Sequence, residues 1–137
     1  MRSAIPLCLV LLLTSGCVRR APYDAFVHPD FDARRPPMLV LTVEEADPET
    51  VSEAARDSVY EAVGEALIEK DYVVQVPDEP PGPETGLARV VMLAEEPRLT
   101  AVLSVFDAKD MRLLRVEVEG KTARELAERL TRALPVK

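Results

Sequence analysis

The chain contains few of the residues that most often carry chemistry. Its 137 residues include one histidine, two cysteines and five glycines. After residue 17 there is no CxxC motif, no Ser–His arrangement and no glycine-rich phosphate loop. We therefore expect no catalytic residue, no cofactor and no metal site, and the sequence favours a protein that is not an enzyme.

Basic residues are outnumbered by acidic ones. The chain has 17 lysines and arginines against 24 aspartates and glutamates, and its net charge is −7. Such a surface repels phosphate backbones and anionic headgroups. The composition argues against nucleic acid as a partner and against electrostatic docking to membranes, while simple solubility accounts for the excess of acid.

Long apolar runs are also scarce, and the clearest one lies at the start of the chain. It extends from Ala4 to Leu13, after Arg2, and is followed by Thr14-Ser15-Gly16-Cys17. A bilayer-spanning helix needs about 20 apolar residues, so this run is too short for a stable transmembrane segment. Its length and its positive flank are typical of a signal peptide.

The four residues 14–17 resemble the lipobox of bacterial lipoproteins, with Thr14 at a position where leucine is usual. The resemblance implies cleavage between Gly16 and Cys17 and a lipid anchor on Cys17. Cys8 would leave with the signal, so no thiol would remain for a disulfide, a metal or catalysis. An ordinary secretory signal cut after Gly16, or an apolar N-terminal helix of a soluble protein, are the alternatives.

The resemblance also implies a location and a division of the chain. Val18 follows the cysteine in place of the aspartate that commonly marks inner-membrane retention, which favours the outer membrane, facing the periplasm. Residues 1–16 would be the signal peptide, residues 17–37 the lipidated N-terminus and a proline-rich tether, and residues 38–137 a single domain. We expect the aromatic side chains of Tyr23, Phe26 and Phe31 to fix part of the tether onto the domain.

The first half of the domain shows a strand, a helix and a strand. Residues 38–43 are almost all apolar, which predicts a central strand. Asp47 is suited to cap a helix that has one apolar face and continues to about Glu69. Residues 72–76 predict a second strand, parallel to the first through a right-handed crossover.

The second half predicts a hairpin and a final helix. Residues 86–94 fit either a strand or a helical face, and we favour the strand because the run is short and contains adjacent valines. Residues 99–106 and 112–118 flank a four-residue connection and predict a β-hairpin. Thr122 and Glu125 form a capping box that begins the last helix.

The predicted order is therefore β-α-β-β-β-β-α, an α/β (α+β) two-layer sandwich with a mixed sheet of four to five strands and two helices on one face. This pattern resembles small envelope lipoproteins related to the amino-terminal domain of TolB and to the curli secretion lipoprotein. The likeness rests on residues 37–41, 72–74, 102–107 and 113–115. It implies an accessory role in envelope assembly, secretion or transport, exercised by binding.

His28, Asp30 and Asp32 are candidate metal ligands, because they place an imidazole near two carboxylates. A solvated segment of the tether explains the same residues without a metal. We therefore assign no ligand among them.

Two further groups of carboxylates have simple explanations. Glu44, Glu45 and Asp47 end the first strand, where open α/β sheets often bind ligands, but they also suit the start of a helix. Asp107 and Asp110 lie in the hairpin connection, where aspartate is favoured and the spacing of an EF-hand is absent.

Two functions remain open at the level of sequence. The first is a lipoprotein that docks an envelope protein partner through its sheet or its helices. The second is a carrier or transport auxiliary that binds a lipid or another apolar ligand between sheet and helices. The sequence does not fix the oligomeric state.

Overall fold

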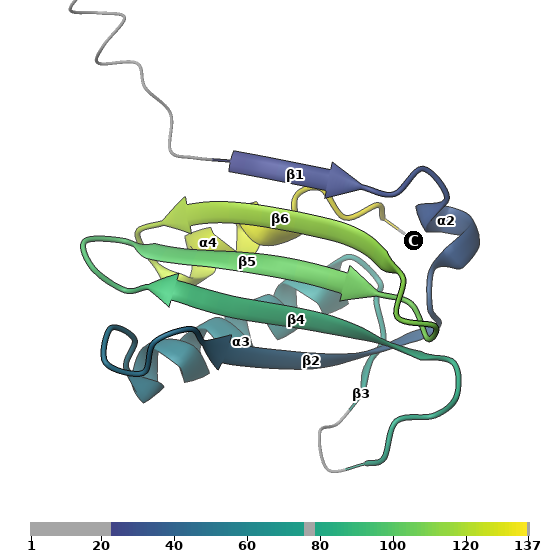
Figure 1. The fold of residues 1–137 in the computed structure, drawn as a ribbon, viewed down its shortest axis with the longest axis horizontal. Coiled ribbons are helices and arrows are strands. Elements are labelled where there is room, and N and C mark those ends of the chain that lie inside the picture. Colours follow the sequence, from purple (N-terminus) through teal and green to yellow (C-terminus); the bar gives the residue numbers. More distant parts are fainter. Residues whose placement is uncertain (1–22, 76–78, 137) are drawn as a thin grey trace, which may run out of the picture.

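Six strands join in one sheet in the computed structural model, which describes residues 23–75 and 79–136 (Figure 1). The sheet order is β1-β6-β5-β4-β2-β3. The elements in chain order are β1 (Tyr23–Val27), α2 (Phe31–Arg34), β2 (Met38–Glu45), α3 (Glu53–Glu69), β3 (Val74–Gln75), β4 (Thr85–Ala94), β5 (Leu99–Phe106), β6 (Arg112–Gly120) and α4 (Ala123–Thr131).

The mixed α+β architecture is confirmed, and the strand count is corrected. From β2 onward the elements follow the predicted order, but the sheet has six strands rather than four to five. The sixth strand, β1, and the short helix α2 lie in the segment predicted as tether, so this segment is part of the fold. β1 pairs antiparallel with β6, through backbone groups that the sequence pattern does not reveal.

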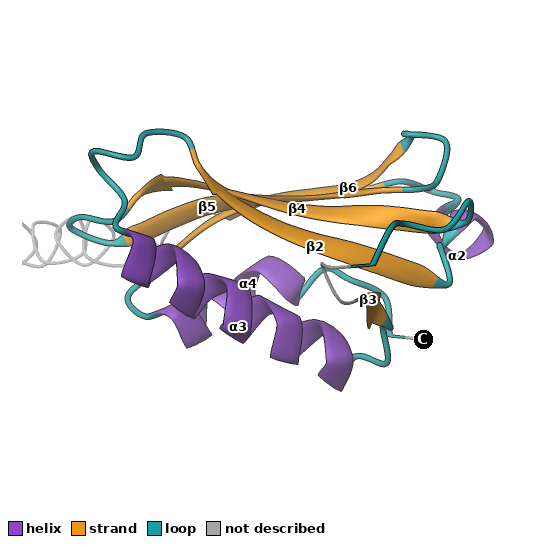
Figure 2. Ribbon diagram, turned by 90° about the horizontal axis from the view of Figure 1, so that it is seen from below, coloured by secondary structure: helices purple, strands orange, loops and turns teal. Residues whose placement is uncertain are grey.

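Helices α3 and α4 cover one face of the sheet and leave the other face open (Figure 2). Helix α4 contacts β5 and β6, while α3 contacts β2 and β3. Fully buried leucine and valine side chains fill the space between the layers, and each contributes about 1.5–3 kcal/mol by leaving water. The largest of them are Leu39, Leu67, Leu103, Leu113, Leu114, Leu126, Leu130, Val59, Val63, Val90 and Val105.

Helix α3 begins later than predicted. Asp47 does not cap it, because its carboxylate instead accepts a hydrogen bond from the Glu49 N–H at 3.0 Å and closes a turn. The N-cap is Ser52, whose hydroxyl accepts from the Ala55 N–H at 3.1 Å. The C-terminal end at Glu69 agrees with the prediction.

The second half of the domain follows the prediction closely. Residues 85–94 form strand β4, which settles the choice between strand and helix. β5 and β6 form the antiparallel hairpin, and β2 and β3 are parallel. Thr122 caps α4 by accepting a hydrogen bond from the Glu125 N–H at 3.1 Å.

The segment between β1 and β2 is fixed to the domain by aromatic and cationic side chains. Phe31 is buried, and the Arg35 guanidinium lies over its ring at 5.5 Å and over the Tyr72 ring at 5.1 Å. Pro36 crosses the sheet at Gly86, where a Cβ would lie 2.5 Å from the proline ring. Only glycine leaves room for Pro36 here. The close approach lets the segment that joins α2 to β2 pass next to β4.

The C-terminal end of α4 is held by side chains that follow α3. The Lys70 amine donates to the carbonyls of Thr131 and Leu134 at 2.5 and 3.2 Å, and burial lowers the pKa of Lys70, with a smaller contribution from Arg132. Such carbonyls have no partner within the helix and attract cations. In residues 23–75 and 79–136, every helix is too short or too polar to span a bilayer.

Candidate functional site

Gly16 and Cys17, the residues predicted for signal cleavage and lipidation, lie outside the residues that the structure describes. Their roles therefore remain predictions from the sequence. The described chain begins at β1, six residues after Cys17.

The His28 cluster is used for local structure. The Nδ1 atom of His28 accepts a hydrogen bond from the Asp30 N–H at 2.9 Å, and the Asp32 carboxylate bonds Arg35 at 2.9 Å. Among the described residues, no group of three histidine, cysteine or acidic side chains could hold a metal ion. These contacts hold the turn between β1 and α2 in an ordered segment, where the sequence predicted a solvated tether.

The three carboxylates at the end of β2 point to different partners. Glu44 pairs with Arg89, and Glu45 lies 3.5 Å from Arg56 of α3. Asp47 forms the turn described above. The structure does not bring these acids together, so they form no acid and base pair.

The aspartates of the β5–β6 connection stabilise the turn. The buried Asp107 carboxylate accepts hydrogen bonds from the N–H groups of Lys109 and Met111, each at 2.9 Å, and lies 3.7 Å from Arg34. Asp110 has a φ of 63°, a conformation that aspartate tolerates better than most residues. These contacts account for both aspartates without a bound cation.

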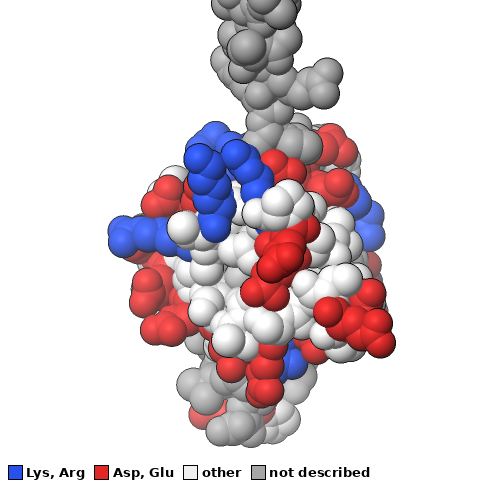
Figure 3. All heavy atoms as spheres, turned by 90° about the vertical axis from the view of Figure 1, so that its left-hand side faces the viewer, with Lys and Arg blue, Asp and Glu red and all other residues white. Residues whose placement is uncertain are grey.

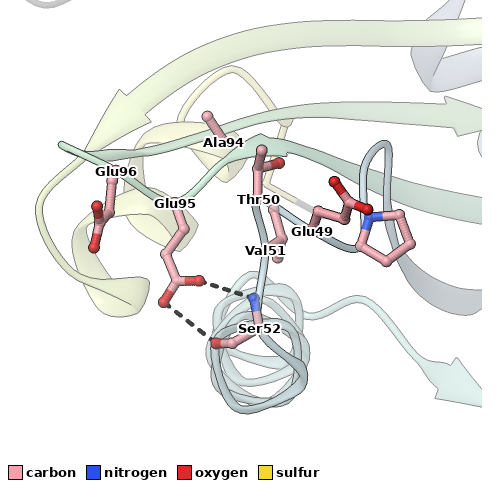
Figure 4. Close-up of a pocket in the computed structure, with 8 residues that line it drawn as sticks. Glu49, Thr50, Val51, Ser52, Ala94, Glu95 and Glu96 are labelled. Atoms are coloured by element: carbon pink, nitrogen blue, oxygen red, sulfur yellow. Dashed lines mark hydrogen bonds between the residues drawn. The ribbon is translucent and has the colours of Figure 1, made fainter.

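A cleft of about 650 Å³ lies where β2 and β4 end, beside the start of α3. The sequence reasoning missed its central contact: the Glu95 carboxylate accepts from the Ser52 N–H at 2.8 Å and from the Ser52 hydroxyl at 3.3 Å (Figure 4). Glu49 and Glu96 lie on opposite sides of the cleft and do not converge. Glu95 therefore serves as a cap for α3, as a carboxylate does at the positive end of a helix.

Acidic groups surround this end of the molecule. Figure 3 views the end where β2, β4 and β6 finish, and shows acidic side chains spread among uncharged ones, with the largest group of basic side chains at the upper left. The basic groups of this region include Arg98, which bonds Glu119 at 3.3 Å. This end of the described domain is therefore a charged, solvent-exposed surface.

A second cleft, of about 540 Å³, lies between α2 and the β5–β6 turn. Arg34, Arg35 and Lys109 line it together with prolines and with the acids Glu84 and Asp107. Its charges are of both signs, and Arg35 is held by Asp32 and the two aromatic rings. The cleft therefore has no clear preference for a charged ligand.

A further unassigned surface is the face of the sheet opposite α3 and α4, which no helix of the described residues covers and which we call the open face. The strand registers place its side chains in rows that cross the strands. One row contains Val40, Leu87, Phe106 and Arg112, the next contains Thr42, Arg89, Ser104, Arg115 and Phe26, and a third contains Glu44, Val91, Val102, Glu117 and Asp24.

The open face combines partly buried apolar side chains with charges that pair among themselves. Arg89 pairs with Glu44, while Arg115 lies 3.1 Å from Glu117 and 3.9 Å from Asp24. Ion pairs within the face reduce the cost of removing those charges from water. The alternation of apolar and charged residues from Leu114 to Val118 is the sequence signal for this face, because every second side chain must point away from the core.

Strand β1 lies at the edge of the sheet, outside the area that the helices cover. Ala25 and Val27 belong to the same rows as the buried Val116 and Leu114 of β6, on the side of the helices. Both are nevertheless exposed, Val27 by 39%, because α4 packs under β5 and β6. Phe26, on the open face, is 48% exposed. β1 is therefore an edge strand with exposed apolar side chains on both faces.

Comparison with known proteins gives a likeness of fold. No model of a protein family matches the chain, and no curated protein matches it either. Two solved structures of PelC dodecamers from Paraburkholderia phytofirmans do. One, of a PelC variant, has a TM-score of 0.62 at 11% identity and covers 86% of this chain and all of that chain. The other has a TM-score of 0.57 at 12% identity and covers 82% and 95% of the two chains.

At such low identity these matches establish a shared fold and nothing more. The alignment nevertheless spans nearly the whole PelC subunit, so the likeness is that of a complete domain. The sequence resemblance to the TolB amino-terminal domain and the curli secretion lipoprotein stays a hypothesis.

Proposed function

We propose that this chain is a lipid-anchored lipoprotein of the bacterial outer membrane that faces the periplasm and acts by binding. In this proposal it assembles with copies of itself and presents the open face to an envelope protein partner, as an accessory component of envelope assembly, secretion or transport. The observation that carries the proposal is the open face, an uncovered sheet surface with apolar rows and internally paired charges.

Three observations support this proposal. Surfaces that combine apolar area with compensated charge are suited to protein contacts. The acidic side chains of the candidate sites serve as caps, turns and ion pairs within the domain, which leaves the open face as the surface available to a partner. The solved proteins of the same fold are dodecamers, and most soluble oligomers are closed assemblies of identical copies.

The alternative, a carrier of an apolar ligand, has less support. It requires space between the sheet and the helices, where the buried side chains form one continuous apolar cluster. The clefts of about 650 and 540 Å³ lie at the ends of the sheet and are lined largely by charged and turn residues. Partner binding therefore accounts better for the surface.

The anchor is tested by replacing its cysteine. In the full chain, Cys17→Ser should abolish labelling with radioactive fatty acid and release the protein from the membrane fraction. Cys8→Ser is the matched control, because Cys8 lies in the predicted signal, and it should leave both labelling and fractionation unchanged. Retention of labelled protein in the Cys17→Ser variant would overturn the lipid anchor.

The binding surface is tested by placing a charge at one of its apolar positions. Val91 is partly buried on the open face, between Glu44 and Val102 in the third row. Val91→Lys should remove envelope proteins that copurify with the lipidated wild type from detergent-solubilised membranes. The control Ala54→Lys, on an exposed position of α3, should keep them. Loss in both variants, or in neither, would contradict a partner on the open face.

A further inference from the structure

The fold shortens the segment between the proposed lipid anchor and the domain. The sequence predicts a tether of residues 17–37, but β1 begins at Tyr23, so residues 18–22 alone separate the fold from Cys17. A chain extends by at most about 3.6 Å per residue, and the distance from Cys17 to Tyr23 therefore cannot exceed about 22 Å. An acylated Cys17 holds the start of β1 within this distance of the lipid headgroups.

The strand pairing fixes which end of the domain lies beside this anchor. Tyr23 is opposite Val118, so β6 continues past the start of β1 to Gly120, and the connection to α4 follows at Lys121. Leu99 pairs with Gly120, which brings the β4–β5 turn to the same end. The β5–β6 turn lies at the other end of β6, about 30 Å away, because each strand residue advances about 3.3 Å.

Basic side chains gather at one corner of the anchored end. This corner contains Arg98, Lys121 and Arg124, and we call it the basic corner. Lys121 is exposed and forms no ion pair among the described residues. Arg124 is 86% exposed, and its pair with Glu128 at 3.6 Å is an exposed one that contributes little. Figure 3, in which the β1 side of the sheet is uppermost, shows the largest group of basic side chains at the upper left.

Acidic side chains occupy the part of the same end that is farther from the anchor. Asp47 and Glu49 follow β2, Glu96 lies in the β4–β5 turn, and all three are exposed. The four strand spacings between β1 and β2 amount to about 19 Å. The charge of this end is therefore divided, with basic groups beside the anchor and acidic groups away from it.

We propose that the basic corner lies against the phosphate headgroups of the membrane that holds the anchor. This inference rests on the lipid anchor in the proposed function. The net charge of −7 opposes docking of the chain as a whole, so the anchor supplies the affinity and the local charges decide which corner faces the membrane. Arg19 and Arg20, between Cys17 and β1 in the sequence, add positive charge next to the anchor.

This orientation also restricts the partner of the open face. The strands lead away from the bilayer, so the open face is turned sideways, along the membrane. A protein that binds this face has to reach the domain next to the bilayer. The partner is therefore a protein embedded in or attached to the same membrane.

Fluorescence quenching in vesicles tests the orientation of the full lipidated chain. Lys121→Cys and Ala108→Cys each introduce one free thiol, because Cys17 is acylated and Cys8 is removed in the proposed mature chain. Each variant carries a nitrobenzoxadiazole dye and is reconstituted in phosphatidylcholine and phosphatidylglycerol with a nitroxide on the headgroup. The dye at residue 121 should lose most of its fluorescence. The dye at residue 108, in the exposed β5–β6 turn, is the matched control and should keep it.

Two further variants separate the basic corner from the rest of the anchored end. The dye on Glu49→Cys should be quenched less than the dye at residue 121, and Arg124→Glu should weaken the quenching at residue 121. Equal quenching at residues 121 and 108, or no effect of Arg124→Glu, in protein that floats with the vesicles would overturn the orientation and leave the anchor intact. Protein that does not float with the vesicles would overturn the lipid anchor and this inference with it.

Discussion

Strand β5 at the centre of the sheet and strand β1 at its edge belong to the same sheet, but they are held in different ways. β5 pairs on both sides, and Ala101, Leu103 and Val105 have no exposed surface beneath the helices. β1 pairs with β6, and its side chains from Asp24 to Val27 are exposed. Burial of apolar side chains adds to backbone pairing in the first strand, whereas the second strand is held mainly by backbone pairing on one side.

This difference indicates which parts of the sheet can bind a partner while the domain stays folded. The side chains of β5 that face the helices are already buried and have nothing to gain from a partner, so β5 can bind only through its alternate side chains on the open face. An edge strand with exposed apolar side chains gains on both faces and along its free backbone edge. The same comparison separates the residues that determine folding from those that are available for assembly.

The largest expected effect tests this comparison directly. Leu103→Ala removes a fully buried side chain and should lower the free energy of unfolding by about 2–5 kcal/mol. Phe26→Ala removes a larger side chain from an exposed position and should change it by no more than about 0.5 kcal/mol. Urea unfolding of both variants, in a Cys17→Ser background that avoids detergent, measures the difference.

Similar losses in the two variants would contradict the comparison. They would mean that Phe26 packs against further parts of the chain and that β1 belongs to the core. The background variant alone provides the reference for both measurements.

The same contrast explains what could be predicted from the sequence. β5 and β6 alternate between buried and exposed side chains, so their pattern of period two identifies them. Residues 23–27 form a short segment of mixed side chains that shows no such pattern, because β1 depends on backbone pairing with a strand far along the chain. A short edge strand of this kind has no local signal.

The candidate site was less predictable than the fold. The start of α3 was misplaced because Asp47 also fits an N-cap, whereas the true cap, Ser52, is fixed by Glu95 from the end of β4. The position of Arg35 between Phe31 and Tyr72 likewise joins residues from separate elements. Contacts of this kind depend on the tertiary structure, and no spacing in the sequence predicts them.

A smaller loss of stability is expected at Tyr72, which contacts Arg35 in the segment between β1 and β2. Its hydroxyl donates a hydrogen bond to the Pro135 carbonyl at 2.6 Å, and Arg35 of the segment that follows β1 lies over its ring. Tyr72→Phe should remove about 0.5–1.5 kcal/mol at neutral pH, which is the usual net contribution of one hydrogen bond. Urea unfolding of the variant and its Cys17→Ser background at pH 7 measures this loss.

The pH dependence of the same variant sharpens the comparison further. Burial raises the pKa of Tyr72 to about 12, with Arg35 opposing and Asp32 adding to the effect, whereas an unfolded tyrosine has a pKa of about 10. Because the folded state holds the proton more tightly, this contribution to stability is complete below pH 10 and disappears as the pH rises towards 12. The stability difference between the background and Tyr72→Phe should therefore shrink over this range. If the stability difference instead stays constant from pH 9 to 12, Tyr72 has the same pKa in the folded and unfolded states, which would contradict a buried hydroxyl at this position.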